Sequence, residues 1–202
     1  MREYMNGLVC GIGINDSPTP VTKKINGKLV WICPIYRYWK GMFGRCYNKA
    51  THNNQPTYKG CSVHEDWHTY SRFKEWALSQ DWKGKQLDKD ILFVGNKLYS
   101  ADTCVFVNKL TNTFILDSAG ARGNDKIGVF RNGINYLAFC KDPFKRYKSY
   151  LGTFKTEEEA HEAWLSKKLE YAYEIVELES DVRVKEAIID RYKNYNKNPD
   201  NN

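Results

Sequence analysis

The sequence predicts an α+β protein with a central ββα module and a C-terminal three-stranded antiparallel sheet packed on a helix. Short apolar runs bounded by turn residues alternate with segments of helical periodicity, and the last such runs precede a long amphipathic stretch. A chain of 202 residues suits one medium domain or two small ones. No apolar run approaches the ~20 residues of a membrane span, and the start lacks a signal-peptide pattern, so we expect an intracellular protein.

The net charge of +7 predicts an acidic partner. Nucleic acid is the commonest such partner, because phosphates attract Lys and Arg and release counterions on binding. Aromatic residues make up 14% of the chain, which provides both core mass and surfaces for stacking on bases. A basic protein without a nucleic-acid partner is the plainer interpretation.

Residues 1–35 are rich in turn formers and predict an irregular N-terminal segment with a hairpin at 25–32. From Tyr36 to Cys46, large apolar residues recur at helical spacing. Residues 62–80 predict a further helix, in which Ser62 and Glu65 can form a capping box. Its aromatic stripe is at the spacing of a core-facing helix surface, which favours packing over base stacking.

The central stretch predicts a strand over 86–94, a turn at 95–97 that can lead into a second strand, and then a short helix. Ser100 can cap that helix, which would carry Cys104, Val105 and Val107. Asp88 and Asp90 would lie on one face of the strand, and Lys89 on the other.

Residues 118–126 predict a linker, and residues 127–175 predict the sheet domain. Two short strands flank the turn "RNG", and a third strand precedes a helix that starts at a capping box of Thr156 and Glu159. Residues 176–202 predict a last helix followed by a polar tail.

Basic and tyrosine side chains concentrate in and before this sheet, which is typical of a surface laid against nucleic acid. A solvated face is the alternative. The predicted DNA-binding residues are Arg122, Lys126, Arg131, Tyr136, Lys141, Arg146, Lys148 and Tyr150.

Residues 128–164, "GVFRNGINYLAF…YLGTFKTEEEAHEAW", resemble the APETALA/ethylene-response-factor DNA-binding domain. The resemblance implies a three-stranded sheet that enters the major groove of double-stranded DNA with its outer face. Residues 141–149 depart from the pattern, because this chain has a longer and more basic insertion there.

Residues 36–117 resemble the HNH module of phage-encoded homing endonucleases, on "YRYWKGMFGRCYN", "EDWHTYSRFKEW" and "LDKDILFVGNKLYSADTCVFVNKLTN". The resemblance implies a ββα-metal centre using Mg²⁺ or Mn²⁺, held by Asp88 and Asn112. Lys89 takes the place of the catalytic His, and Asn96 or Asn108 that of the central Asn. Either Lys89 acts as base or phosphate clamp, or Asp90 replaces it, or the centre is inactive.

A structural zinc site is a competing hypothesis for the region before this module's strand. His64 and His68 are four residues apart, and Cys61 and Cys46 could complete a tetrahedral set. A capped helix with exposed histidines explains the same spacing. Either histidine could also approach Asp88 and serve as the missing base.

The leading functional prediction is an HNH-type DNA endonuclease acting in the host cytoplasm, with the sheet domain selecting the site. Lys89, Asp90 and Asn96 would be its catalytic residues. The first alternative is a non-catalytic DNA-binding protein that serves as a regulator or counter-defence factor. The second is an inhibitor that binds a host protein.

Overall fold

The computed structural model describes residues 7–116, 126–145 and 147–195. The chain divides between Phe106 and Val107 into two compact units, each of which is described by itself. Helices and strands occur in both units, and the C-terminal unit contains a three-stranded antiparallel sheet, which confirms the α+β class. Within the described ranges, no helix combines the length and the apolar character needed to cross a bilayer.

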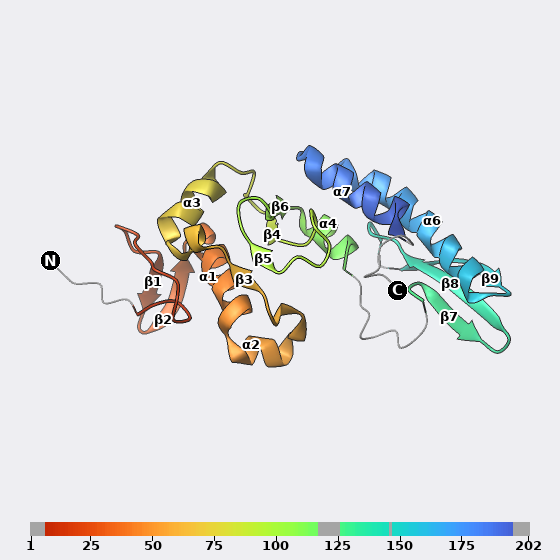
Figure 1. The fold of residues 1–202 in the computed structure, drawn as a ribbon, viewed down its shortest axis with the longest axis horizontal. Helices are drawn as coiled ribbons and strands as arrows, with labels where there is room; N and C mark the ends of the chain where they lie inside the picture. Colours follow the sequence, from red (N-terminus) through yellow and green to blue (C-terminus); the bar gives the residue numbers. More distant parts are fainter. Residues whose placement is uncertain (1–6, 117–125, 146, 196–202) are drawn as a thin grey trace. The chain divides into compact units, whose positions relative to one another are not determined.

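The N-terminal unit combines short strands with helices (Figure 1). Its elements are β1 (Thr22–Ile25), β2 (Lys28–Ile32), α1 (Pro34–Tyr47), α2 (Lys49–Asn54), the 3-10 helix η1 (Pro56–Tyr58), β3 (Ser62–Val63), the 3-10 helix η2 (Glu65–His68), α3 (Tyr70–Leu78), β4 (Gln86–Asp88), β5 (Leu98–Tyr99) and β6 (Val105–Val107), the last crossing the boundary.

The predicted N-terminal hairpin is confirmed. β1 and β2 pair antiparallel around Asn26 and Gly27, whose φ angles are +49° and +76°. Asn and Gly are the residues that adopt positive φ at least cost, so this dipeptide selects a tight hairpin turn. The predicted helix beyond it is confirmed as α1.

The core of this unit is aromatic. Trp39, Met42 and Phe43 of α1 are fully buried and pack with Phe73 of α3 in one cluster. The Trp39 indole donates a hydrogen bond of 2.7 Å to the carbonyl of Trp67, which satisfies its only polar atom inside the core. The aromatic stripe of the second helix is therefore core, as its spacing predicts.

The predicted helix over 62–80 is wrong in its first turns. Ser62 and Val63 form β3, which pairs in parallel with β5, and the Ser62 amide donates to the Lys97 carbonyl at 2.8 Å. A capping box at Ser62 therefore does not form, and α3 begins only at Tyr70. The local sequence favours a helix at Ser62 and Val63, but pairing with β5, more than thirty residues further along the chain, makes this segment a strand instead.

The predicted order strand, turn, second strand and helix is also wrong over residues 86–107. β4 ends at Asp88 and pairs with β6, whereas β5 pairs with β3. Residues 105–107 are a fully buried strand rather than a helix. Val-Phe-Val is β-branched and aromatic, a composition that suits a strand buried on both faces. The Ser100 hydroxyl does accept from the Thr103 amide, but it closes a turn.

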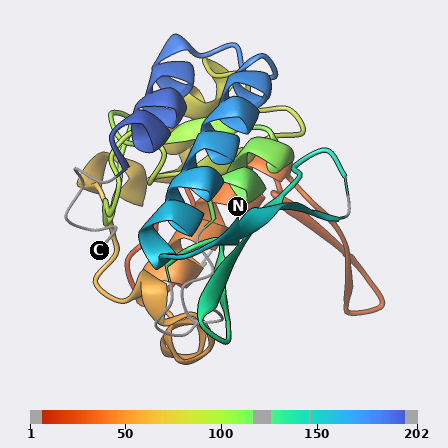
Figure 2. The same cartoon turned by 90° about the vertical axis from the view of Figure 1, so that its right-hand side faces the viewer.

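The C-terminal unit is a three-stranded sheet covered by helices. Its elements are α4 (Lys109–Phe114), β7 (Val129–Asn132), β8 (Asn135–Lys141), β9 (Lys148–Phe154), α6 (Glu157–Val176) and α7 (Val182–Lys193). The strand order β7-β8-β9 is antiparallel throughout, as predicted, and α6 lies across one face of the sheet (Figures 1 and 2).

The predicted capping box at the start of α6 is confirmed. The Thr156 hydroxyl accepts from the Glu159 amide at 3.2 Å, and the Glu159 carboxylate accepts from the Thr156 amide. Val129 and Ala138 pack against Ala160 of α6 and form the buried side of the sheet. The predicted last helix is α7. The segment predicted as the HNH-like module, 36–117, runs across the unit boundary, since α4 belongs to the C-terminal unit.

Candidate functional site

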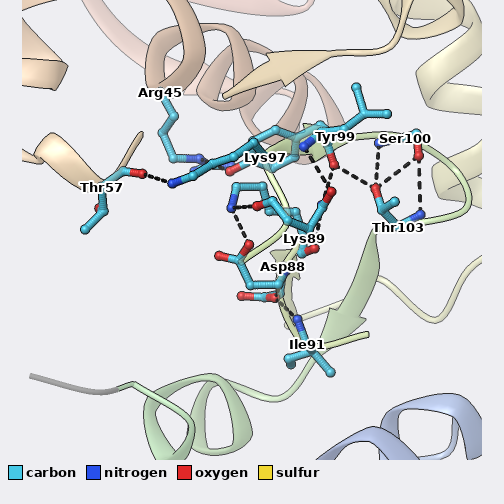
Figure 3. A network of polar contacts seen from close by, with 12 residues as sticks. Arg45, Thr57, Asp88, Lys89, Ile91, Lys97, Tyr99, Ser100 and Thr103 are labelled. Atoms are coloured by element: carbon cyan, nitrogen blue, oxygen red, sulfur yellow. Dashed lines mark hydrogen bonds and ion pairs between the residues drawn. The ribbon is translucent and has the colours of Figure 1, made fainter. Parts of the chain in front are cut away.

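Residues 88–98 form a loop that closes on the buried side chain of Lys89 (Figure 3). The Lys89 side chain is 5% exposed, and its ammonium donates to the Asp90 carboxylate and, at 2.6 Å, to the Asn96 carbonyl. It also lies 5.9 Å from the centroid of the Tyr99 ring. A buried ammonium with these partners is satisfied inside the protein, which is the condition under which a lysine can be buried.

Asn96 closes the same loop with its side-chain amide. Its Nδ2 donates to the carbonyls of Lys89 at 2.8 Å and Leu98 at 2.7 Å, and its Oδ1 accepts from the Leu98 amide. Both sides of the amide group are thus bonded to backbone atoms of one loop. An Asn at this position holds the chain reversal between β4 and β5.

Asp88 acts as a side-chain cap at the end of β4. Its Oδ1 accepts from the amides of Asp90 at 2.7 Å and Ile91 at 2.8 Å (Figure 3). Burial raises the pKa of the Asp88 carboxyl, and the two amide donors offset part of this effect. This carboxylate therefore organises the loop through local backbone bonds, in the manner of an Asx turn.

The contacts of the predicted metal ligands can be compared with the metal centre that the resemblance implies. Within the described ranges, no three His, Cys, Asp or Glu side chains gather as a ligand group. Asp88 is engaged by backbone amides, and Asp90 is paired with Lys89. Asn112, the second predicted ligand, is half-buried on α4 of the other unit. The structure thus brings Asp88, Lys89, Asp90 and Asn96 together, in an arrangement that holds a loop.

The two cysteines predicted for zinc are neighbours in the core, and the two histidines are bonded to backbone atoms. Cys46 and Cys61 are buried, and burial raises the pKa of the Cys46 thiol to about 12, the neighbouring Cys61 adding to the shift. The His68 ring is hydrogen-bonded to the Val63 carbonyl at 3.0 Å, and His64 accepts from the Asp66 amide. The two histidines do not share a helix face, because His64 precedes the 3-10 turn that His68 ends.

The β7-β8-β9 sheet has one face turned away from α6, and aromatic rings line it. Phe139 lies between Phe130 and Tyr150, with ring centroids 5.5 and 5.4 Å apart, and Phe130 and Tyr150 are 45% and 56% exposed. Cross-strand register places Lys141 opposite Lys148 on the same side. These five residues are hereafter the aromatic-lysine face.

Two polar contacts order the aromatic-lysine face. The Lys148 ammonium lies 5.0 Å from the centroid of the Phe130 ring, at a distance typical of a cation–π contact. The Tyr150 hydroxyl is hydrogen-bonded to the Thr153 hydroxyl at 2.7 Å. The described cross-strand partners on this side of the sheet include no carboxylate, so none of them offsets the charge of the two lysines.

The other predicted DNA-binding residues that the structure describes lie off this face. Tyr136 packs against the core cluster on the α6 side, and Arg131 is its register partner. The Lys126 ammonium is 3.4 Å from the Glu158 carboxylate. Arg122 and Arg146 lie outside the described residues.

Lys141, Lys148 and Tyr150 of the aromatic-lysine face are among the residues predicted from the sequence, whereas Phe130 and Phe139 are not. Alternation along β7 and β8 could have found them, because each follows a small or β-branched residue that faces the core. Searches of protein-family descriptions, curated proteins and solved structures found no match to this chain. Its function has to be inferred from its own residues.

Proposed function

We propose that this protein binds double-stranded DNA through the aromatic-lysine face of the β7-β8-β9 sheet. The observation that carries the proposal is a ladder of three rings, two of them exposed, flanked by two lysines. The described register partners on this side of the sheet include no carboxylate. Lysines supply phosphate contacts, and aromatic rings pack on sugars and base edges. The ordered Lys148 and Tyr150 side chains reduce the entropy lost when such contacts form.

The support is electrostatic as well as geometric. A net charge of +7 attracts a polyanion. The aromatic-lysine face adds apolar contact area beside the two positive charges of Lys141 and Lys148. α6 buries the opposite face of the sheet, so the strands are held as a rigid platform. A surface that binds DNA needs side chains held in fixed positions, and a rigid sheet provides this.

The test is DNA binding measured by fluorescence anisotropy with a labelled random-sequence duplex over a series of salt concentrations. We expect Lys141→Gln/Lys148→Gln to lower the slope of log Kobs against log salt by about 2, since each lost phosphate contact removes ~0.9. Tyr150→Ala should weaken binding with little change in slope, because it carries no charge.

Lys109→Gln/Lys193→Gln is the matched control, because it removes two exposed lysines from the same unit outside the sheet. It should leave the slope close to that of the wild type. Equal losses in the two double variants would refute a specific role for the aromatic-lysine face. Binding that is weak and independent of salt would instead favour a protein partner.

Cleavage of the bound DNA is the leading activity that the sequence predicts. The side chains of Asp88, Lys89 and Asn96 form hydrogen bonds within residues 88–98. We therefore expect the protein to bind plasmid DNA in Mg²⁺ or Mn²⁺ without nicking it. Nicking by wild-type protein that Asp88→Asn abolishes, while DNA binding and folding persist, would establish the nuclease.

A further inference from the structure

The β1-β2 hairpin, hereafter the ribbon, extends from the N-terminal unit (Figure 1), and its outer face carries exposed side chains. Register places Lys23 opposite Trp31 and Ile25 opposite Lys28, and the register shift after Lys23 lets both pairs lie on this face. Ile25 is 52% exposed and Trp31 is 48% exposed. An isolated two-stranded hairpin is marginally stable in water, so exposed apolar side chains on one are expected to serve a contact.

The inner face of the ribbon borders a pocket of its own unit, although its residues are also exposed. Lys24 and Leu29, which are register partners, line a pocket of about 460 Å³ together with Lys40 of α1. The Cys33 amide donates to the Val21 carbonyl at 2.8 Å and ties the base of the ribbon to the unit. The base of the ribbon is therefore attached to its unit, and positive charge continues from the ribbon to α1.

The charge of this region has one sign. Residues 17–64 contain eight Lys and Arg and no Asp or Glu. Lys23, Lys24 and Lys28 are exposed, and none of them pairs with a carboxylate among the described residues. A surface with uncompensated lysines beside Trp31 is complementary to a polyanion, whereas most protein surfaces present both signs of charge.

We propose that the outer face of the ribbon is a second contact for double-stranded DNA. Lys23 and Lys28 would neutralise phosphates, and Trp31 would pack against the sugar-base wall of a groove. A two-stranded ribbon fits the major groove, which is about 12 Å wide. The inference extends the proposed function to the N-terminal unit and uses none of the residues of the aromatic-lysine face.

The experiment uses the full chain and the same anisotropy assay. Lys23→Gln/Lys28→Gln should lower the salt slope by about 2, and Trp31→Ala should weaken duplex binding more than Trp31→Phe does. Lys49→Gln/Lys59→Gln is the matched control, with two exposed lysines of the same unit that lie outside the ribbon. Circular dichroism and urea unfolding check that each variant is folded.

The outcomes separate the two proposals. A ribbon variant that binds with the wild-type slope, while the sheet variant loses slope, overturns the ribbon contact alone. Equal losses in the ribbon variant and its control overturn it too, since they show a general charge effect. Stronger binding of single strands than of duplex also overturns it. Absence of any duplex binding by the wild type overturns both proposals.

Discussion

The loop around Lys89 illustrates how one residue can be explained by chemistry or by architecture. A lysine beside two aspartates suggests a reactive site when only the sequence is considered. In the structure, the ammonium bonds to Asp90 and to the Asn96 carbonyl, and the Asn96 amide bonds to the same loop. These contacts satisfy every buried polar group that they involve, which favours a loop-holding role.

At the residue scale, substitutions of Asp88 can distinguish whether its carboxylate acts as a hydrogen-bond acceptor for the loop or through its negative charge. Burial raises the pKa of its carboxyl, so the folded state binds a proton at higher pH than the unfolded chain. The ionised group therefore costs stability at neutral pH, and this cost disappears as pH falls through the raised pKa towards the unfolded value of about 3.9. Asparagine keeps the accepting Oδ1 without the charge.

We expect Asp88→Asn to be at least as stable as the wild type near pH 7, with any gain shrinking as pH falls to about 4. Asp88→Ala should lose about 1–2 kcal/mol, because two amides lose their acceptor. Urea unfolding of both variants at the two pH values measures the difference. A loss in Asp88→Asn as large as that in Asp88→Ala would show that the charge itself is needed.

The cysteines are distinguished by burial. Burial raises the pKa of Cys46 and Cys104 to about 12 and that of Cys140 to about 11. Only a thiolate reacts readily with a disulfide reagent, so these thiols should be inert in the folded protein. Cys10 is exposed.

We expect Cys10 to give the main fast phase when native protein is treated with Ellman's reagent, because its side chain is exposed to the reagent. Cys10→Ser should remove that phase, and Cys46, Cys104 and Cys140 should react only after denaturation. A fast phase of unchanged size in Cys10→Ser would contradict the assignment.

At the element scale, one glycine lets β7 lie against α6. Gly128 has a φ of +82°, and a Cβ there would meet the Trp164 Cδ1 atom at 2.1 Å. Gly133, in the β7-β8 turn, also has a positive φ, of +62°, but faces open space. An added Cβ at Gly128 would cause both steric overlap and backbone strain, whereas at Gly133 it would cause backbone strain alone. Comparing the two substitutions therefore isolates the cost of the overlap.

We expect Gly128→Ala to cost about 3 kcal/mol or more, because it adds overpacking to strain. Gly133→Ala should cost about 1 kcal/mol, from the left-handed backbone alone. Chemical denaturation of the two variants measures these losses. Similar values at the two sites would show that Trp164 moves aside and that the strand-helix approach is not tight.

At the scale of the whole molecule, basic surface occurs on both units. The ribbon belongs to the N-terminal unit and the aromatic-lysine face to the C-terminal unit. Charge changes at sites with no shared partner act independently, so their effects on the salt slope should add if both surfaces contact one duplex.

The combined variant, with Lys23, Lys28, Lys141 and Lys148 all changed to Gln, should therefore lower the slope by about 4. The anisotropy assay on a duplex longer than either footprint measures it. A combined change no larger than that of one double variant would mean that the two surfaces do not act on the same DNA molecule.

Local signals determined much of this protein. Asn26-Gly27 specified the hairpin, apolar spacing specified α1, and Thr156 with Glu159 specified the start of α6. The clustering of lysines and tyrosines in the last sheet also indicated its outer face, although not which rings line it. These features depend on residues a few positions apart, which periodicity and capping rules describe well.

Tertiary structure decided the rest. Ser62 and Val63 became a strand because β5 supplies their hydrogen bonds, and Val105–Val107 became a strand because β4 does. The role of Lys89 depends on Asn96 and Tyr99, which the loop brings back onto it. Such contacts join residues that are distant in sequence or meet across a loop, and no local pattern encodes them. The sequence therefore determined which segments could carry charge and rings, while the fold decided which side chains remain available for a partner.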